Sequence, residues 1–515
     1  MNFIFQKIVV CLAATILLAS TVESHAFALL GPFAPWMQAT NGVIQSGDIG
    51  GPMDIGSGYR WNVPVVTYGF DKSFLDYFGT NGVAAVQSAI QIINDLPPAS
   101  SLVPTNFPFD TQSFNYTAQA QALYDLKSQT LVLLLEHLGL AQPSRNIFVM
   151  KQWTSAFSPA NYPSLYFIST NAFLSQSLWP DWFIPNFIAM RNFDPQTLTA
   201  SQYVNDSLYT AYVQKPGGIA IVPVDPYADS YSAVADIGNS YNLNSGEFFT
   251  GLTYDDVGGL AYLLSTNNVN YETLLPNIIG IGANSNSFVN GAWRPGMDKI
   301  TFIPQPVDLP SGALLPTTNY FTDNYLTNGV LHHQQMARTI SKPDFLFSAG
   351  DVTLDVPALP FFARTGTTNW LNNAAANGNT NGEGPGVIQP QVQIVFNKLG
   401  QQFSSFGSYF TGQDYDQSQF WASFDNSTNE PIIYPIPQAG TNQMTVRMWL
   451  TLGRNIQKNF EWKPSSLPGA QFTMQTSTDL INWATLFTVA NNSSVCTYFN
   501  NNPPDARRFY RLIPQ

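Results

Sequence analysis

The clearest helical pattern in the chain lies in residues 81–95, NGVAAVQSAIQIIND. Apolar side chains recur there at the spacing of one helix face, at Val83, Val86, Ile90 and Ile93. A pair of prolines, Pro97 and Pro98, follows directly and cannot continue a helix. We therefore predict an amphipathic helix that ends before this pair.

A second helix is predicted over residues 117–138, where the run LVLLL leads into Glu136 and His137. Gly139 and Pro143 follow, and glycine then proline is typical of a helix C-terminus. The run is apolar on every side, so we expect this helix to be buried.

Two strands and a third helix complete the first part of the chain. Residues 61–70 predict a strand, placed at a sheet edge because Pro64 has no N–H to donate, and residues 217–224 predict a short buried strand. Thr253, three residues before Asp256, predicts a capped helix start. Together these patterns predict an α+β N-terminal domain over residues 29–275, opening with a Gly- and Pro-rich arm at 29–59.

Beyond Pro276, short apolar segments separated by Gly, Pro and Asn predict a β-rich region over residues 276–465. These segments are 299–303, 352–359, 387–397 and 444–452. Residues 364–386 are predicted to form a mobile loop, and residues 328–340 to form a helix. The last 50 residues, 466–515, alternate in polarity and predict a separate, small all-β module.

The N-terminus has the pattern of a signal peptide. Lys7 precedes a short apolar run over residues 8–20, and Ala26-Phe27-Ala28 gives a cleavage pattern, so residues 1–28 are expected to be removed. No later stretch is apolar for long enough to span a membrane. We therefore expect an exported protein, in the periplasm, at the cell surface or outside the cell, with no transmembrane segment after cleavage.

Composition narrows the class of partner. Charged residues make up only 10% of the 515 residues, the net charge is −12, and no basic run is present, which argues against nucleic acid. Removing the signal leaves one cysteine, Cys496, so neither an internal disulfide nor a cysteine-rich zinc site is expected. The remaining partners are a protein or a glycan, neither of which the sequence identifies.

Glu136 and His137 are weak catalytic candidates. A zinc peptidase of the HExxH type needs a second histidine four residues away, but with His137 as either ligand that position is Ala141 or Leu133. The weak metal candidates are His137, His332 and His333, and the adjacent pair is expected to point in different directions. We predict no metal and no cofactor, and expect Glu136 and His137 to close a helix.

Three segments carry a resemblance to matrixin-like metallopeptidases: VPVVTYGF with the helix after it, LLLEHLGLAQP, and GLTYDDVGGLAYLL. The last is similar to the closing LTxDDIxGIxxLY helix of that group, and the resemblance covers about residues 61–275. Because HExxH is missing, it implies a degenerate, metzincin-type scaffold without inherited activity.

Two further resemblances point to export. DIGGPMDIGSGYRWNVPVVTYGFD with LEHLGLAQPSR resembles an uncharacterised family of large exported bacterial proteins. FTMQTSTDLINWATLF with RRFYRLIPQ is similar to a short C-terminal β-module common on exported proteins.

These observations favour an exported, non-catalytic structural or interaction protein. The alternative is a secreted hydrolase, either a metallopeptidase with atypical ligands around His137 or a glycoside hydrolase that uses two carboxylates. The candidate carboxylates are scattered, at Glu136, Glu247, Glu272, Glu383, Glu430 and Glu461. Assembly into a polymer or surface layer also suits the low charge. Aromatic residues, 14% of the chain, suit either a sugar-binding face or a packed core.

Overall fold

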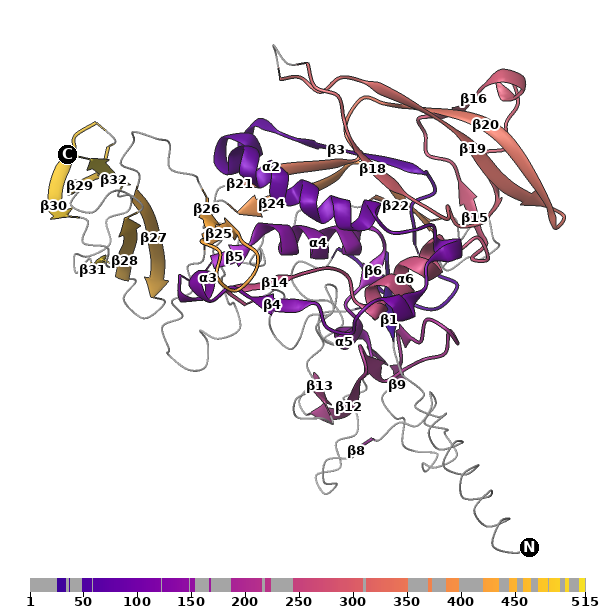
Figure 1. Cartoon of the computed structure of the whole chain (residues 1–515), viewed down its shortest axis with the longest axis horizontal. Helices are drawn as coiled ribbons and strands as arrows, with labels where there is room; N and C mark the ends of the chain where they lie inside the picture. Colours follow the sequence, from indigo (N-terminus) through magenta and orange to yellow (C-terminus); the bar gives the residue numbers. More distant parts are fainter. Residues whose placement is uncertain are drawn as a thin grey trace, which may run out of the picture.

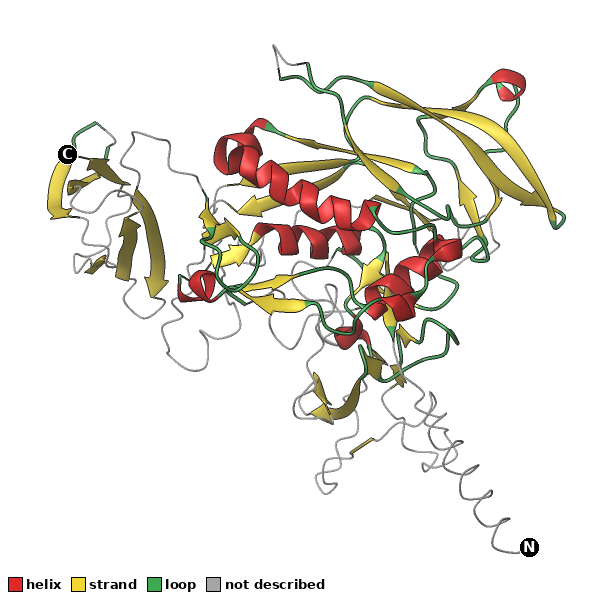
Figure 2. Cartoon of the chain, in the orientation of Figure 1, coloured by secondary structure: helices red, strands yellow, loops and turns green. Residues whose placement is uncertain are grey.

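A computed structural model shows a mixture of helices and many strands, broadly α+β and rich in β-structure (Figures 1 and 2). The structure describes residues 26–33, 37, 49–57, 59–121, 123–147, 149–152, 166–167, 187–214, 218–223, 244–308, 312–350, 369–372, 386–397, 420–434, 444–451, 457–464, 471–479, 481–490, 496–499 and 509–514.

A parallel sheet of four strands forms the centre of the molecule. Its order is β18 (Thr301–Pro304), β3 (Val65–Phe70), β21 (Phe345–Gly350) and β24 (Val392–Asn397). The expected edge position of the first predicted strand is therefore wrong. Pro64 precedes β3, so its missing N–H removes no hydrogen bond from the sheet. β3 therefore lies between two neighbouring strands.

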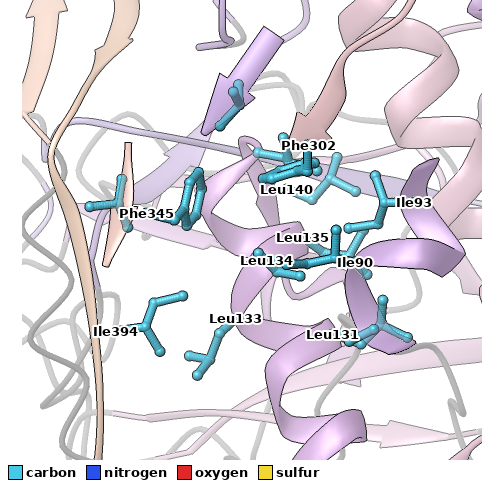
Figure 3. Close-up of a cluster of buried hydrophobic side chains, with 14 of the residues drawn as sticks. Ile90, Ile93, Leu131, Leu133, Leu134, Leu135, Leu140, Phe302, Phe345 and Ile394 are labelled. Carbon is cyan, nitrogen blue, oxygen red and sulfur yellow. The ribbon is translucent and has the colours of Figure 1, made fainter. Parts of the chain in front are cut away.

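Helices α2 (Lys72–Asn94) and α4 (Leu126–His137) pack together beside this sheet (Figure 1). Their apolar side chains meet those of the strands in one core (Figure 3), which includes Ile90, Ile93, Leu131, Leu134, Phe302, Phe345 and Ile394. The helix predicted at 81–95 begins earlier than expected, because Asp71 caps α2 by accepting from the N–H of Phe74. Gly79, at φ 58°, kinks α2.

The helix predicted over residues 117–138 is interrupted. α3 (Tyr116–Ala120) is followed by β5 (Leu123–Asp125), which pairs in parallel with β25 (Phe420–Ser423), and only then does α4 begin. Asp125 ends β5 and caps α4, since its carboxylate accepts from the N–H and hydroxyl of Ser128. The prediction that α4 is buried and ends before Gly139 is confirmed.

Asp125 makes folding stability depend on pH. Burial raises the pKa of its carboxyl to about 6, against the lowering effect of the Ser128 donors. The folded state therefore holds this proton more tightly than the unfolded state does. The stabilisation of the folded state by this proton is fully present below about pH 3.8 and is lost as the pH rises to about 6.

We expect Asp125→Asn to flatten the pH dependence. Asparagine keeps a capping oxygen but cannot ionise. The free energy of unfolding of the variant should therefore rise relative to that of wild type between pH 4.5 and 7.5, by at most about 3 kcal/mol. Urea unfolding at both pH values measures this difference. An identical pH slope for the two proteins would show that Asp125 is not the titrating group.

The second large sheet is antiparallel and has five strands. Its order is β15 (Asn270–Thr273), β17 (Gly291–Arg294), β19 (Thr317–Thr327), β20 (Val330–Ile340) and β16 (Ile278–Gly280). The helix predicted at 328–340 is wrong, because these residues form β20. Asn328 and Gly329, both at positive φ, make the two-residue turn that joins β19 to β20.

A buried ion pair connects the two large sheets. Arg338, on β20, donates to both carboxylate oxygens of Asp344, and Asp344 accepts from the N–H of Thr67 on β3. The five-stranded sheet itself contains strands from both sides of the boundary expected at 275/276, and the parallel sheet joins β3 to later strands. Both sheets therefore cross that boundary, and one core includes residues from each side.

The prediction of a Gly- and Pro-rich arm at 29–59 is wrong for residues 29–31 and 51–53, which form buried strands. β1 (Phe27–Gly31) pairs with β2 (Gly51–Met53), β6 (Leu140–Ala141) and β10 (Asn192–Phe193). The buried carboxylate of Asp255 accepts from the N–H of Ala26. Cleavage after Ala28 would therefore remove two residues from a buried strand. Residues 1–25 lie outside the described part of the chain.

The last strands form two small sheets. One contains β27 (Met444–Thr451), β28 (Gln457–Pro464) and β31 (Cys496–Phe499), and the other contains β30 (Ala484–Ala490), β29 (Gln471–Ser477) and β32 (Phe509–Pro514). β31 thus pairs across the expected boundary at 465/466. In the second sheet Arg511 lies over the Trp483 ring and donates to Gln475.

The loop predicted at 364–386 contains a strand, β22 (Asn369–Asn372), paired with β23 (Gly386–Gln389). The rest of that loop and the strand predicted at 352–359 lie outside the described residues. The remaining elements are η2 (Ala99–Ser101), η3 (Pro104–Asn106), β4 (Gln112–Phe114), α5 (Pro143–Asn146), β7 (Val149–Gln152), β8 (Tyr166–Phe167), β9 (Phe187–Ala189), β11 (Tyr203–Val204), β12 (Ser207–Gln214), β13 (Gly218–Pro223), β14 (Glu247–Phe249), α6 (Tyr254–Leu264), η5 (Gly282–Asn284) and β26 (Ile432–Ile433).

Candidate functional site

Glu136 and His137 lie inside the core, at the last turn of α4. The Nδ1 atom of His137 donates to the carbonyl of Leu133, one turn back, at 2.7 Å, and its ring meets Phe345 edge to face. The backbone carbonyl of His137 accepts from the indole of Trp61 at 2.9 Å, and Glu136 accepts from Gln142. Both side chains are buried, with relative exposures of 6% and 1%, and their contacts are internal to the fold.

His332 and His333 lie on β20, outside the core. Successive side chains of a strand point to opposite faces, so the two rings cannot share an ion. His333 bonds to the side chain of Asn324, and His332 stacks on Tyr325. Within the described residues, no group of three or more His, Cys, Asp or Glu side chains could hold a metal ion.

The described glutamates considered for glycoside hydrolysis bond within the fold or stand exposed. Glu272 pairs with Arg60, and burial raises the pKa of its carboxyl against the lowering effect of Arg60. Glu247 accepts from the backbone and side chain of Asn244. Glu430 is exposed on a loop. Glu383 lies outside the described residues, and the side chain of Glu461 is not described.

The five-stranded sheet offers a different kind of site, because its two faces are unlike. The inner face is buried and ionic except at the tip of the β19–β20 hairpin, where Val330 and His332 are exposed. On its buried part, Arg294 donates to both oxygens of Asp323, which also accepts from Gln334. Arg60, which lies in the segment before β3, also reaches this face and pairs with Glu272. Every charge named here has an opposite partner, so this face holds the sheet in place.

The opposite face, which we name the outer face, carries exposed aromatic and aliphatic side chains together with uncharged polar ones. By strand alternation and register its positions are Tyr271, Thr273, Ile279, Gly291, Trp293, Thr318, Tyr320, Thr322, Asn324, Leu326, Leu331, His333, Gln335, Ala337 and Thr339. Its large apolar side chains are far more exposed than core residues, at 48% for Trp293, 72% for Tyr320 and 58% for Ile279. Exposed apolar surface of this extent is typical of a contact site.

The register arranges these side chains in rows across the strands. One row runs Tyr271, Trp293, Leu326, Leu331, over four adjacent strands. In this row the Tyr271 and Trp293 rings meet edge to face with centroids 5.8 Å apart. Gly291 leaves space for the ring, since a Cβ there would lie 2.7 Å from the Tyr271 hydroxyl.

A second row, Tyr320, Ala337, Ile279, crosses the face nearer its other end; Tyr320 and Ile279 are exposed, and Ala337 between them is buried at 4%. Two polar pairs lie between the rows: Gln335 donates to Thr322 at 2.9 Å, and Asn324 bonds to His333 at 2.6 Å. The outer-face positions of the described strands hold no Asp, Glu, Lys or Arg. In Figure 1 the β19–β20 hairpin extends away from α2 and α4.

This face was not predicted from the sequence, because the residues of β20 were expected to form a helix. The missed signal is the Asn328-Gly329 pair between two stretches of strand-forming residues. Once that turn is recognised, pairing of residues 317–327 with 330–340 aligns the apolar side chains.

No protein-family model, curated protein or solved structure matches this chain. Among the described residues, every helix is too short or too polar to pass through a bilayer.

Proposed function

We propose that this chain is an exported, non-catalytic interaction protein, and that the outer face is its contact surface. The observation that carries the proposal is the exposure of aligned aromatic and aliphatic side chains on a sheet whose other face is fixed by buried ion pairs. A rigid support with exposed aromatic residues is the arrangement that binding surfaces use.

The contacts of Glu136 and His137 also support a non-catalytic function. Their contacts close α4 and attach it to Trp61 and Phe345, which is a structural role. The hydrolase alternatives gain no observation from the geometry, and the matrixin-like scaffold, the export signal and the cell-surface location stay predictions. Retention on bacterial cell-envelope fragments, compared between outer-face variants and matched controls, tests the proposal.

A further inference from the structure

We infer that the outer face binds a linear, uncharged polysaccharide, with sugar rings stacked on the Tyr271–Trp293 row and on Tyr320, and hydroxyls bonded to the polar pairs between them. This inference rests on the proposed function, because it names the partner of the same surface. Three features of the outer face favour such a ligand: the spacing of the two rows, the chemistry of the side chains between them, and the lack of charge.

The two rows are separated along the strands by an extended length of sheet. Tyr320 and Leu326, which lie in different rows, are six residues apart on β19. At about 3.4 Å per residue, the separation is about 20 Å. A ligand that touches both rows must therefore be elongated and follow the strand direction, as a linear polymer does and a small compact molecule does not.

The side chains between the rows suit a ligand covered in hydroxyl groups. Thr322, Asn324, His333 and Gln335 point to this face, and their mutual hydrogen bonds hold them in position. Each amide also has a second polar atom that these bonds do not use, so both donors and acceptors are present. A sugar presents hydroxyls at its edge and C–H groups on its ring face, and the C–H face packs on aromatic rings.

Charge distinguishes an uncharged polysaccharide from anionic glycans and cationic segments as the ligand. The chain has a net charge of −12, but the outer-face positions of the described strands contain no acidic or basic residue. An anionic glycan would meet no cation there and would be repelled by the protein as a whole. A cationic segment would find no carboxylate to pair with. An uncharged polymer loses nothing on this surface.

The test is native affinity electrophoresis of the full chain in gels that contain one soluble polysaccharide each. The neutral, extended polymers are hydroxyethyl cellulose, mixed-linkage β-glucan and galactomannan, and the charged polymers are alginate and heparin. We expect at least one neutral polymer to retard the protein, and Trp293→Ala to raise the apparent Kd at least tenfold, while Tyr116→Ala leaves it unchanged.

Tyr116 is 65% exposed and lies on α3, away from the outer face, so it is a matched control. Far-UV circular dichroism and thermal unfolding check that each variant is folded. Retardation only by a charged polymer, by no polymer, or equally for Trp293→Ala and wild type would overturn the inference. If envelope retention still requires the outer face in that case, the proposed function stands and only the ligand class is wrong.

Discussion

Replacing Arg338 by alanine is expected to lower the free energy of unfolding by about 3–5 kcal/mol. Arg338 and Asp344 are both buried, at 1% and 0% exposure, and Arg338 donates to both oxygens of the carboxylate. Removing the guanidinium leaves Asp344 charged in the core with only neutral donors, chiefly Thr67. Because this pair connects β20 to β3, the loss affects both large sheets. Equilibrium unfolding in urea measures it.

The control is a double variant, Arg338→Met with Asp344→Asn. It removes both charges, while asparagine still offers an oxygen to the N–H of Thr67. We expect it to be clearly more stable than Arg338→Ala, because the cost of breaking a buried pair is mostly that of the charge left behind. A single variant that loses under 1 kcal/mol would mean that Asp344 is not isolated in the core.

Gly139→Ala is expected to destabilise the fold by about 3 kcal/mol or more. Gly139 has φ +111°, a backbone conformation that costs alanine about 1–3 kcal/mol. In addition, a Cβ at this position would lie 2.3 Å from the backbone carbonyl oxygen of Tyr59, which cannot move without shifting its segment. Overpacking of that kind adds about 1–3 kcal/mol.

Gly56→Ala separates the two contributions. Gly56 also has positive φ, at +81°, but a Cβ there meets nothing within 4 Å. We expect this variant to show only the conformational cost, and the difference between the two in urea unfolding to report the clash with Tyr59. Equal losses at both positions would mean that the turn after His137 has room for a side chain, contrary to the packing described.

Local patterns were sufficient where one segment decides its own structure. Thr253 and Asp256 form the expected capping box at the start of α6, and the apolar run before Glu136 forms the buried helix α4. The halt at Gly139 was also predicted, since glycine there adopts positive φ. In each case the deciding contacts lie within one helix and its caps.

Long-range pairing was not predictable in the same way. β3 joins a sheet with β21 and β24, almost 280 and 330 residues further on by the registers Tyr68↔Phe345 and Phe345↔Val392, and no local spacing encodes that. Arg338 lies within the helix predicted at 328–340, yet it belongs to a strand and pairs with Asp344 beside the parallel sheet. The exclusion of HExxH was a matter of spacing, whereas the outer face required the register of five strands.

The most direct test of the proposed interaction function is retention of the purified chain on bacterial cell-envelope fragments. We predict saturable binding that Trp293→Ala with Tyr320→Ala weakens at least about tenfold, because exposed aromatic residues dominate such surfaces. The matched control, Tyr116→Ala with Ile481→Ala, removes an equally exposed aromatic and an apolar residue elsewhere, at 65% and 81% exposure, and should bind as wild type does. Equal binding by both double variants, or no binding by wild type, would contradict the account.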